Sequence, residues 1–335
     1  MPSILEYAET EFSLLAEKPF TDVDSLLLSQ FSYMNLSAFE DELKDENKIE
    51  IRELLKAERF EKLMFHVRDT KSNMRLLYAM ASSPRWRNIK IGNFVEKLCD
   101  QSEEQFAAIT VYLDDDHACA VFRGTDATLV GWKEDFNMSF IMPVPSQEAA
   151  VEYINSTCQY IRGRLYIGGH SKGGNLAIYS AVKCSERVRK KIDCVYNNDG
   201  PGFDVNMIKS AKYQAMLPLI KSIVPENSIV GMLLEHDEDY IIVKSSQSGL
   251  MQHDAMSWQV LGAFLVKAKK LSAQSRRLNK ALSSWINSVD NERREEFVET
   301  LFGLLYASGA KNLSDVSADL SLIHISEPTR LGMIS

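Results

Sequence analysis

One ten-residue stretch, Tyr166–Asn175, constrains most strongly what this chain can fold into. It contains the pattern G-x-S-x-G, in which Gly169 and Gly173 flank Ser171. The short apolar run Leu165–Ile167 predicts a buried strand before the pattern, and the small residues after it predict a helix. A sharp strand-to-helix turn strains its central residue and leaves no room for side chains two positions to either side. The pattern therefore predicts that Ser171 stands exposed at the carboxyl end of a strand.

A serine in this position is the nucleophile elbow of α/β hydrolases, and the free amides of the following helix favour negative charge beside it. The alternative interpretation is a glycine-rich turn without chemistry, because short patterns of this kind also arise by chance. We therefore expect a three-layer α/β hydrolase with a mostly parallel sheet and helical extensions at both ends. The remaining parts of the catalytic apparatus must then follow in the right order along the chain.

Composition excludes several classes of function. The 335 residues are 45% hydrophobic and 25% charged, which is ordinary for a soluble globular protein. A net charge of −8 argues against a nucleic-acid surface. The sequence shows neither an apolar run of about 20 residues nor a secretory signal. Five scattered cysteines without a C-x-x-C pair favour reduced thiols, so we expect a cytoplasmic protein: Cys99, Cys119, Cys158, Cys184 and Cys194.

Four segments are expected. Residues 1–100 would form a helical extension packed on the core, residues 101–258 the hydrolase core, and residues 259–319 a helical cover. Residues 320–335 resemble the in-frame translation of a transposon-end sequencing adapter, and we interpret them as a non-native scar. His324 is accordingly excluded as a site residue.

The first 100 residues carry helix signals. Asp22 or Asp24 could cap a helix, residues 39–66 look charged and helical, and Lys71–Met80 is amphipathic. His66 lies among apolar residues, where a packed or surface histidine is a better interpretation than a catalytic one. The apolar face of the capped helix would comprise Leu26, Leu27, Phe31 and Met34.

A hairpin is expected next, formed by strands at Phe106–Leu113 and His117–Phe122 around the acidic turn Asp114–Asp116. Three carboxylates could suggest a metal site, but no ligand set surrounds them, so a solvated turn is preferred. We expect no metal and no cofactor.

The second strand runs into Phe-Arg-Gly-Thr, followed by Trp132 and Asp135, which resembles the oxyanion-loop region of class 3 lipases. From about Phe12 to Leu313 the chain resembles a bacterial family of uncharacterised, lipase-like α/β hydrolases. That resemblance implies the fold and a serine-hydrolase apparatus, but it assigns no substrate. The matching stretches are Asp24-Ser25 with Ser29-Gln30, Arg123–Phe136, Gly168–Asn175, Asn198–Phe203 and Gln252–Trp258.

In that geometry the backbone amides of Thr125 and Lys172 form the oxyanion hole, and the Thr125 hydroxyl could add a third donor. For Arg123 we expect a structural ion pair, with Asp135 as a candidate partner. Trp132 would pack in the core or line a pocket.

The triad acid is expected after the strand Ile192–Tyr196, where the turn Asn197–Phe203 carries Asp199. This turn resembles the one that holds the acid in pancreatic-type lipases. Class 3 lipases instead place the acid after the next strand, and the counterpart here has Ser228 at that position. This departure favours Asp199, although an aspartate that only caps its turn is the alternative.

The triad histidine should follow the last strand, Asp239–Ser245. His253 fits that place, whereas His236 precedes the strand and lies at its wrong end. The order Ser171, Asp199, His253 is the order of α/β hydrolases. A histidine that caps a helix with the next residue, Asp254, is the alternative for His253, and His170 should point back into the fold.

Helices are expected around these elements. Gln147–Arg164 reads as one helix, and residues 138–146 before it read as a substrate-facing loop or a lid. Val260–Ser308 is expected to be helical, with a last helix starting near Arg293. Its apolar stripe comprises Leu261, Phe264, Leu265, Leu271, Leu278, Leu282 and Trp285.

These features predict a serine hydrolase that cleaves a lipid or other acyl ester through an acyl-serine intermediate on Ser171. A thioesterase, acyltransferase or peptidase would use the same triad. A non-catalytic binding module of the same fold is a second hypothesis, and a protein that docks on a membrane surface through residues 141–144 is a third. The oligomeric state is left open.

Overall fold

An eight-stranded sheet runs through the centre of the computed structural model, which describes residues 1–44, 47–99, 101–126, 128–138 and 140–307. Its strands lie side by side in chain order. The first four pair antiparallel, and β4 through β8 pair parallel. The strands are β1 (Lys48–Glu50), β2 (Lys90–Cys99), β3 (Glu104–Tyr112), β4 (His117–Phe122), β5 (Arg164–His170), β6 (Ile192–Asn198), β7 (Ile220–Pro225) and β8 (Tyr240–Val243).

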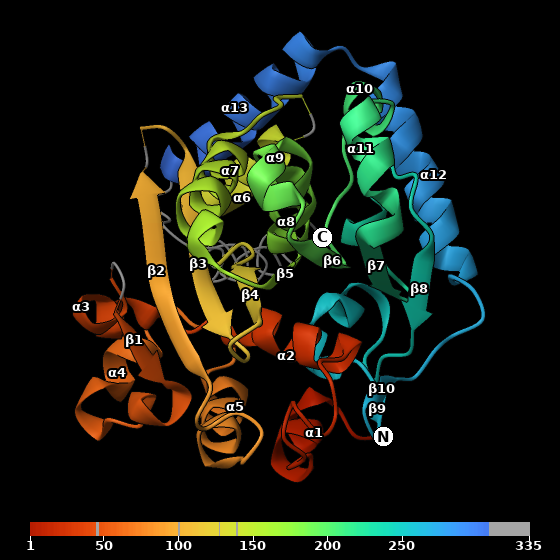
Figure 1. Ribbon diagram of the computed structural model, residues 1–335. Helices are drawn as coiled ribbons and strands as arrows, with labels where there is room; N and C mark the ends of the chain where they lie inside the picture. The colour runs from red at the N-terminus through yellow and green to blue at the C-terminus, as the bar shows by residue number, and fades with distance from the viewer. Residues whose placement is uncertain (45–46, 100, 127, 139, 308–335) are drawn as a thin grey trace, which may run out of the picture.

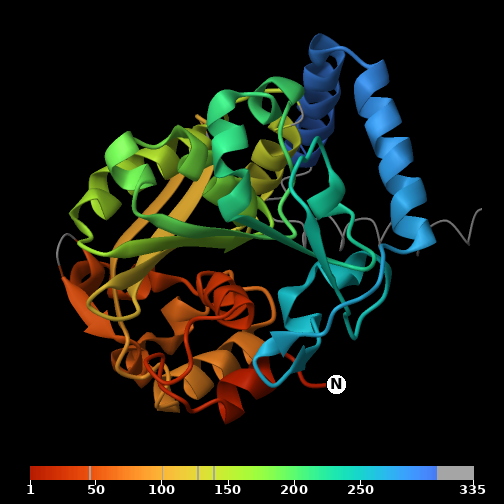
Figure 2. The same cartoon turned by 45° about the vertical axis from the view of Figure 1, so that its right-hand side comes forward.

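Helices cover both faces of the sheet and give three layers (Figures 1 and 2). Parallel strands need crossover connections, and α-helices supply those from β4 to β7, whereas the segment between β7 and β8 holds a single 3₁₀ turn. One face carries α6 (Leu129–Asn137), α7 (Pro145–Thr157), α8 (Lys172–Lys183), α9 (Glu186–Arg189), α10 (Val205–Ile208) and α11 (Ala211–Met216). The other carries α1 (Ile4–Thr10), α2 (Asp22–Phe31) and α5 (Thr70–Ser82). The expected three-layer α/β-hydrolase architecture is confirmed.

Two hydrophobic clusters hold these layers together. Along β3, Ile109 and Val111 belong to the cluster that contains α2, whereas Phe106 and Ala108 belong to the cluster that contains α8. Successive side chains of a strand point to opposite faces, and β4, β6 and β7 likewise contribute buried residues to both clusters. Strands β4 to β7 are largely buried on both sides, and their carboxyl ends form a rim on which a site can lie.

The N-terminal part is less helical than expected. Residues 39–66 hold only short pieces: α3 (Glu40–Leu43), β1, α4 (Phe60–Leu63) and single 3₁₀ turns. Strand β2 also precedes residue 101 and pairs with β3, so the sheet extends into the segment expected to be a helical annex. The expected helix at Lys71–Met80 is confirmed as α5. Helix α2 is capped by Thr21, and Asp24 completes the capping box from the third helical position.

The C-terminal cover also differs from expectation at its start. Residues 260–265 form a hairpin of β9 (Val260–Leu261) and β10 (Phe264–Leu265), turned at Gly262 with φ +59°. Helices α12 (Ala273–Ser288) and α13 (Asn291–Ala307) follow. The expected helix Gln147–Arg164 ends early, since α7 stops at Thr157 and Arg164 begins β5. The proposed scar at 320–335 lies outside the described residues.

No helix in the described ranges is both long and apolar enough to cross a bilayer. All five cysteines are free thiols, and four of them are buried.

Candidate active site

Ser171 sits at the tip of a strained turn between β5 and α8. Its backbone has φ +57° and ψ −131°, a conformation that residues other than glycine rarely adopt. A Cβ added to Gly169 would lie 2.3 Å from the carbonyl of Gly173, and one added to Gly173 would lie 2.3 Å from that of Phe122. Both flanking glycines are therefore required by close backbone approach. The Ser171 side chain does not cap the helix, which leaves its hydroxyl for other contacts.

The structure brings the three expected triad residues together. The Ser171 Oγ lies 3.0 Å from Nε2 of His253, and the His253 Nδ1 lies 2.6 Å from Oδ2 of Asp199. A carboxylate only accepts hydrogen bonds, so the Nδ1 of His253 donates and its Nε2 can accept the serine proton. Asp199 is fully buried, and the imidazole of His253 is 22% exposed. This arrangement can withdraw a proton from Ser171.

Asp199 is held from its other side. It follows β6 with φ +54°, and its Oδ1 accepts a 2.5 Å hydrogen bond from the Ser228 hydroxyl. Gly231 makes room for the carboxylate, because a Cβ there would lie 2.3 Å from Oδ1. Class 3 lipases carry their acid at the position of Ser228. In this chain the Ser228 hydroxyl after β7 instead binds the carboxylate of Asp199, which follows β6. The sequence marks Ser228 only as a departure from class 3 lipases, and its contact with Asp199 is visible only in the structure.

His170 turns into the fold, as its elbow position predicts, and contacts the triad from behind. Its Nε2 lies 2.7 Å from the backbone carbonyl of His253, and its Nδ1 lies 3.0 Å from the hydroxyl of Tyr33. Because a carbonyl can only accept, Nε2 carries the proton and Nδ1 accepts from Tyr33. Burial and the neighbouring His253 hold the pKa of His170 well below its ordinary value. A neutral His170 therefore supports the loop of the triad histidine without competing for the serine proton.

The loop after β4 packs directly against the elbow. A Cβ on Gly124 would lie 2.5 Å from the carbonyl of His170. The backbone just before Thr125 therefore lies close to the elbow, and the amide of Lys172 is at the start of the helix that follows it. These are the two amides expected to form the oxyanion hole. The Thr125 hydroxyl, expected as a third donor, instead donates to Oδ2 of Asp135 at 2.5 Å. Burial raises the pKa of Asp135 to about 6.

Arg123 does form an ion pair, but its partner is Glu96 on β2, at 2.6 Å, rather than Asp135. The expectation of Asp135 as partner was wrong because β2 was not anticipated. Trp132 is partly buried and packs beside a small cluster of Leu129, Val298 and Phe302 that joins α6 to α13.

The Lys172 side chain has a role that sequence reasoning missed. Its Nζ is fully buried and lies 2.9 Å from Oε2 of Glu134, and it also donates to the carbonyl and the side chain of Gln105 at 2.8 and 2.7 Å. The carboxylate of Glu134 further accepts from the amides of Gln105 and Ser146. This buried network ties the start of α8 to α6 and β3, the elements that frame the loop containing Thr125.

The other candidates lie apart from the triad. The acidic turn binds His117 through Asp114 at 2.9 Å and is exposed, as expected of a solvated turn. His236 is engaged by Glu238 at 3.1 Å in a separate buried network. Within the described ranges no cluster of three or more potential metal ligands occurs.

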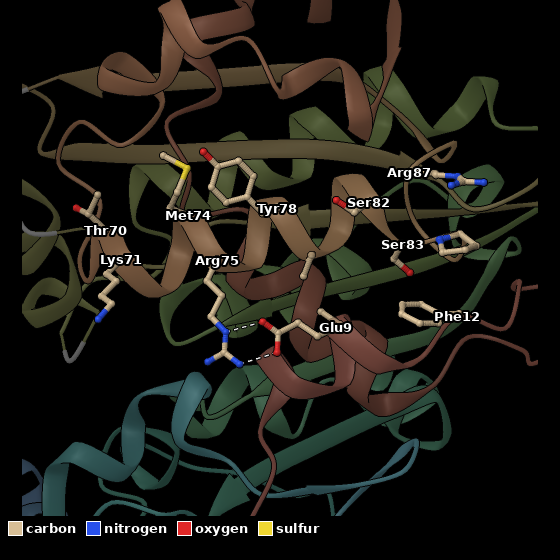
Figure 3. A pocket seen from close by; sticks show the side chains of 13 residues that line it. Glu9, Phe12, Thr70, Lys71, Met74, Arg75, Tyr78, Ser82, Ser83 and Arg87 are labelled. Atoms are coloured by element: carbon tan, nitrogen blue, oxygen red, sulfur yellow. Dashed lines mark hydrogen bonds and ion pairs between the residues drawn. The ribbon is translucent and has the colours of Figure 1, made fainter.

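A groove of about 990 Å³ lies away from the triad, between α1 and α5 (Figure 3). Phe12, Met74 and Tyr78 line it, and Arg75 at its edge is paired with Glu9. None of its lining residues belongs to the triad, so this groove is not the place where the hydroxyl, imidazole and carboxylate could act.

The strand order, the crossover helices and the serine turn after β5 define the class of this protein as the α/β-hydrolase fold. Residues 80–303 match the family model described as Mbeg1-like. The chain belongs to the Mbeg1-like family. No curated protein matches it.

Several solved structures, two of them lipases, are similar to this chain. The Rhizomucor miehei lipase propeptide complex is 17% identical, with a TM-score of 0.40 over 65% of this chain and 66% of that one, slightly less than two thirds of its length. MDLA from Penicillium cyclopium, in a mutant form, is 10% identical, with a TM-score of 0.43 over 75% and 87% of the two chains. M37 lipase is 13% identical, with a TM-score of 0.42 over 77% and 79%. These identities are too low to transfer an activity.

Proposed function

We propose that this protein is a serine hydrolase that cleaves a carboxylic ester of a lipid or other acyl compound, with Ser171 as nucleophile. The observation that carries the proposal is the continuous hydrogen-bonded line from the Ser171 hydroxyl through His253 to the buried Asp199. The structural alternatives do not require these hydrogen bonds. An aspartate that only caps its turn and a histidine that only caps a helix would not be expected to lie in one hydrogen-bonded line with a strained serine at a third strand end.

In the proposed mechanism, the Nε2 of His253 takes the Ser171 proton as Oγ attacks the acyl carbonyl. Asp199 keeps the Nδ1 proton in place and stabilises the imidazolium that forms. The amides of Thr125 and Lys172 stabilise the oxyanion. The imidazolium then protonates the leaving alcohol, and water activated by His253 hydrolyses the acyl-serine. Besides the ester and water, each step uses only groups of this chain.

The test combines an ester assay with covalent labelling. The wild-type chain is expected to hydrolyse a short p-nitrophenyl ester and to be labelled by a fluorophosphonate probe. Ser171→Ala should lose labelling and at least about 10³-fold in kcat/KM, because the triad acts as a unit. His253→Ala should lose activity similarly, whereas His117→Ala removes a partly exposed histidine outside the site and should leave activity unchanged.

Persistent labelling of Ser171→Ala would remove Ser171 from the mechanism. Failure of the wild type to label with any active-site probe would favour the non-catalytic binding module. A panel of oxygen esters, thioesters and amides with graded acyl chains would then identify the preferred acyl bond, since the triad geometry is shared by all three chemistries.

A further inference from the structure

The hairpin formed by β9 and β10 presents an apolar tip to solvent. Leu261 and Phe264 pair across the two strands and are 65% and 75% exposed. Val260 and Leu265 point the other way and are buried, and the amide of Val260 binds the carbonyl of Pro2, which anchors the hairpin base beside the N-terminus (Figure 1). A single exposed apolar residue is normal, but two adjacent large ones on a projecting turn need an explanation.

The segment that holds this tip has an unusual charge. Residues 255–289 contain six basic residues and no acidic one, in a chain with a net charge of −8. Lys267, Lys269 and Lys270 directly follow the hairpin and are exposed. Lys244 is also exposed. It lies beside them, because its backbone forms hydrogen bonds with Val266 and Gln259. Among the residues that the structure describes, none of these four ammonium groups forms an ion pair or hydrogen bond with another side chain.

We propose that the hairpin tip and its lysines dock the protein on an anionic lipid bilayer. Leu261 and Phe264 would enter the boundary between headgroups and acyl chains, while the lysines remain at headgroup level beside phosphate or carboxylate groups. Neither the apolar tip nor the lysines suffice alone, since two side chains bury little apolar area and the attraction of a few charges is screened by salt. The acidic remainder of the molecule is repelled by such a surface, so attachment is confined to this basic segment. This binding is independent of the chemistry at Ser171.

The experiment measures flotation of the full chain with vesicles of phosphatidylcholine, alone or mixed with phosphatidylserine. Binding is expected for the mixed vesicles at low salt and should weaken as salt rises. Leu261→Ser with Phe264→Ser should weaken binding about tenfold or more, because both side chains would leave the bilayer. Changing Lys267, Lys269 and Lys270 to Gln should weaken it about a hundredfold, at about fivefold for each charge near the surface.

Matched controls separate this surface from others. Phe12→Ser changes an apolar residue that is 54% exposed elsewhere, and Lys90, Lys209 and Lys212 changed to Gln remove the same charge from other exposed positions. Neither control should affect binding. Ser171→Ala should bind like the wild type, so loss of the proposed hydrolysis cannot be mistaken for loss of docking.

Equal binding to neutral vesicles, or equal losses in the matched controls, would overturn the proposal. Absence of vesicle binding together with a dimer that Phe264→Ser dissociates would also overturn it. The tip would then be a contact between two copies of this chain. Retained hydrolysis of a soluble ester by the tip variant would show that the altered hairpin leaves the fold intact.

Discussion

The hydroxyl of Ser228 donates a 2.5 Å hydrogen bond to Oδ1 of Asp199, the carboxylate oxygen that His253 does not use. The two residues follow different strands, β6 and β7. The bond therefore fixes the orientation of the acid across two strand ends, and α12 supports it from outside because Ser275 donates to the carbonyl of Ser228.

Ser228→Ala should lower kcat about tenfold or more with little change in KM. A hydrogen bond to a charged group is worth about 1.5–3 kcal/mol, and the freed carboxylate can rotate away from His253. Steady-state kinetics on the ester substrate measure this effect. Ser146→Ala is the matched control, since it removes a buried hydroxyl that has no hydrogen-bond partner among the described residues. Unchanged kcat in Ser228→Ala would mean that Asp199 needs no second support.

His170→Leu should reduce kcat about a hundredfold, because a small displacement of the His253 loop misplaces Nε2 relative to Ser171. His170→Gln keeps a donor for the carbonyl of His253 and should recover most of the rate. Tyr33→Phe removes the hydroxyl that lies 3.0 Å from Nδ1 and 3.4 Å from the carbonyl of His170, and it should have a smaller effect in the same direction. The separate measurement of kcat and KM, with the rate of probe labelling, tests positioning. A change in KM alone would contradict it.

Lys172→Met should lower the free energy of unfolding by about 3–5 kcal/mol, because it leaves the carboxylate of Glu134 buried without its cation. Adding Glu134→Gln removes the uncompensated charge and should restore part of that loss. Urea unfolding of the wild type, both single variants and the double variant measures the coupling. Strictly additive losses would show that the two side chains do not depend on each other.

Stability should decline in acid because of Glu238. Burial raises the pKa of this carboxyl, but hydrogen bonds from His236, Ser222 and Tyr213 outweigh it and lower the pKa from 4.5 to about 2. The difference corresponds to about 3 kcal/mol, which is fully present above pH 4.5 and is lost as the pH falls toward 2.

Glu238→Gln should flatten this part of the pH dependence, whereas Glu61→Gln, an exposed control, should not. Thermal unfolding at several pH values checks both variants. An identical acid profile in Glu238→Gln and wild type would assign the decline to other carboxyl groups.

The site could be predicted from sequence wherever one local constraint fixed the backbone. Ser171 was recognisable because only glycine fits at positions 169 and 173. Asp199 and His253 were recognisable because each follows an apolar run that reads as a strand, and parallel strands bring their carboxyl ends to one rim. The partners of these residues were not recognisable, because the contact of Lys172 with Glu134 joins positions 38 residues apart and depends on how α6 lies over β3.

The errors in secondary structure also have physical causes. Strand β2 was missed because a register shift between Gly92 and Val95, with Asn93 at φ +53°, interrupts its alternation. The i, i+3, i+4 spacing of Leu261, Phe264 and Leu265 predicts a helical face, whereas residues 260–265 form a hairpin. Two of those three side chains point to solvent instead.

The chain-order arrangement of the strands has a consequence for synthesis. Each strand can join the edge of the sheet as it emerges from the ribosome, because its partner has already been made. Ser171 and Asp199 are in place well before residue 253 exists, yet the serine has no base until that residue arrives. Under the proposed function, a chain that ends before residue 253 has no base for Ser171 and is inert toward acyl compounds.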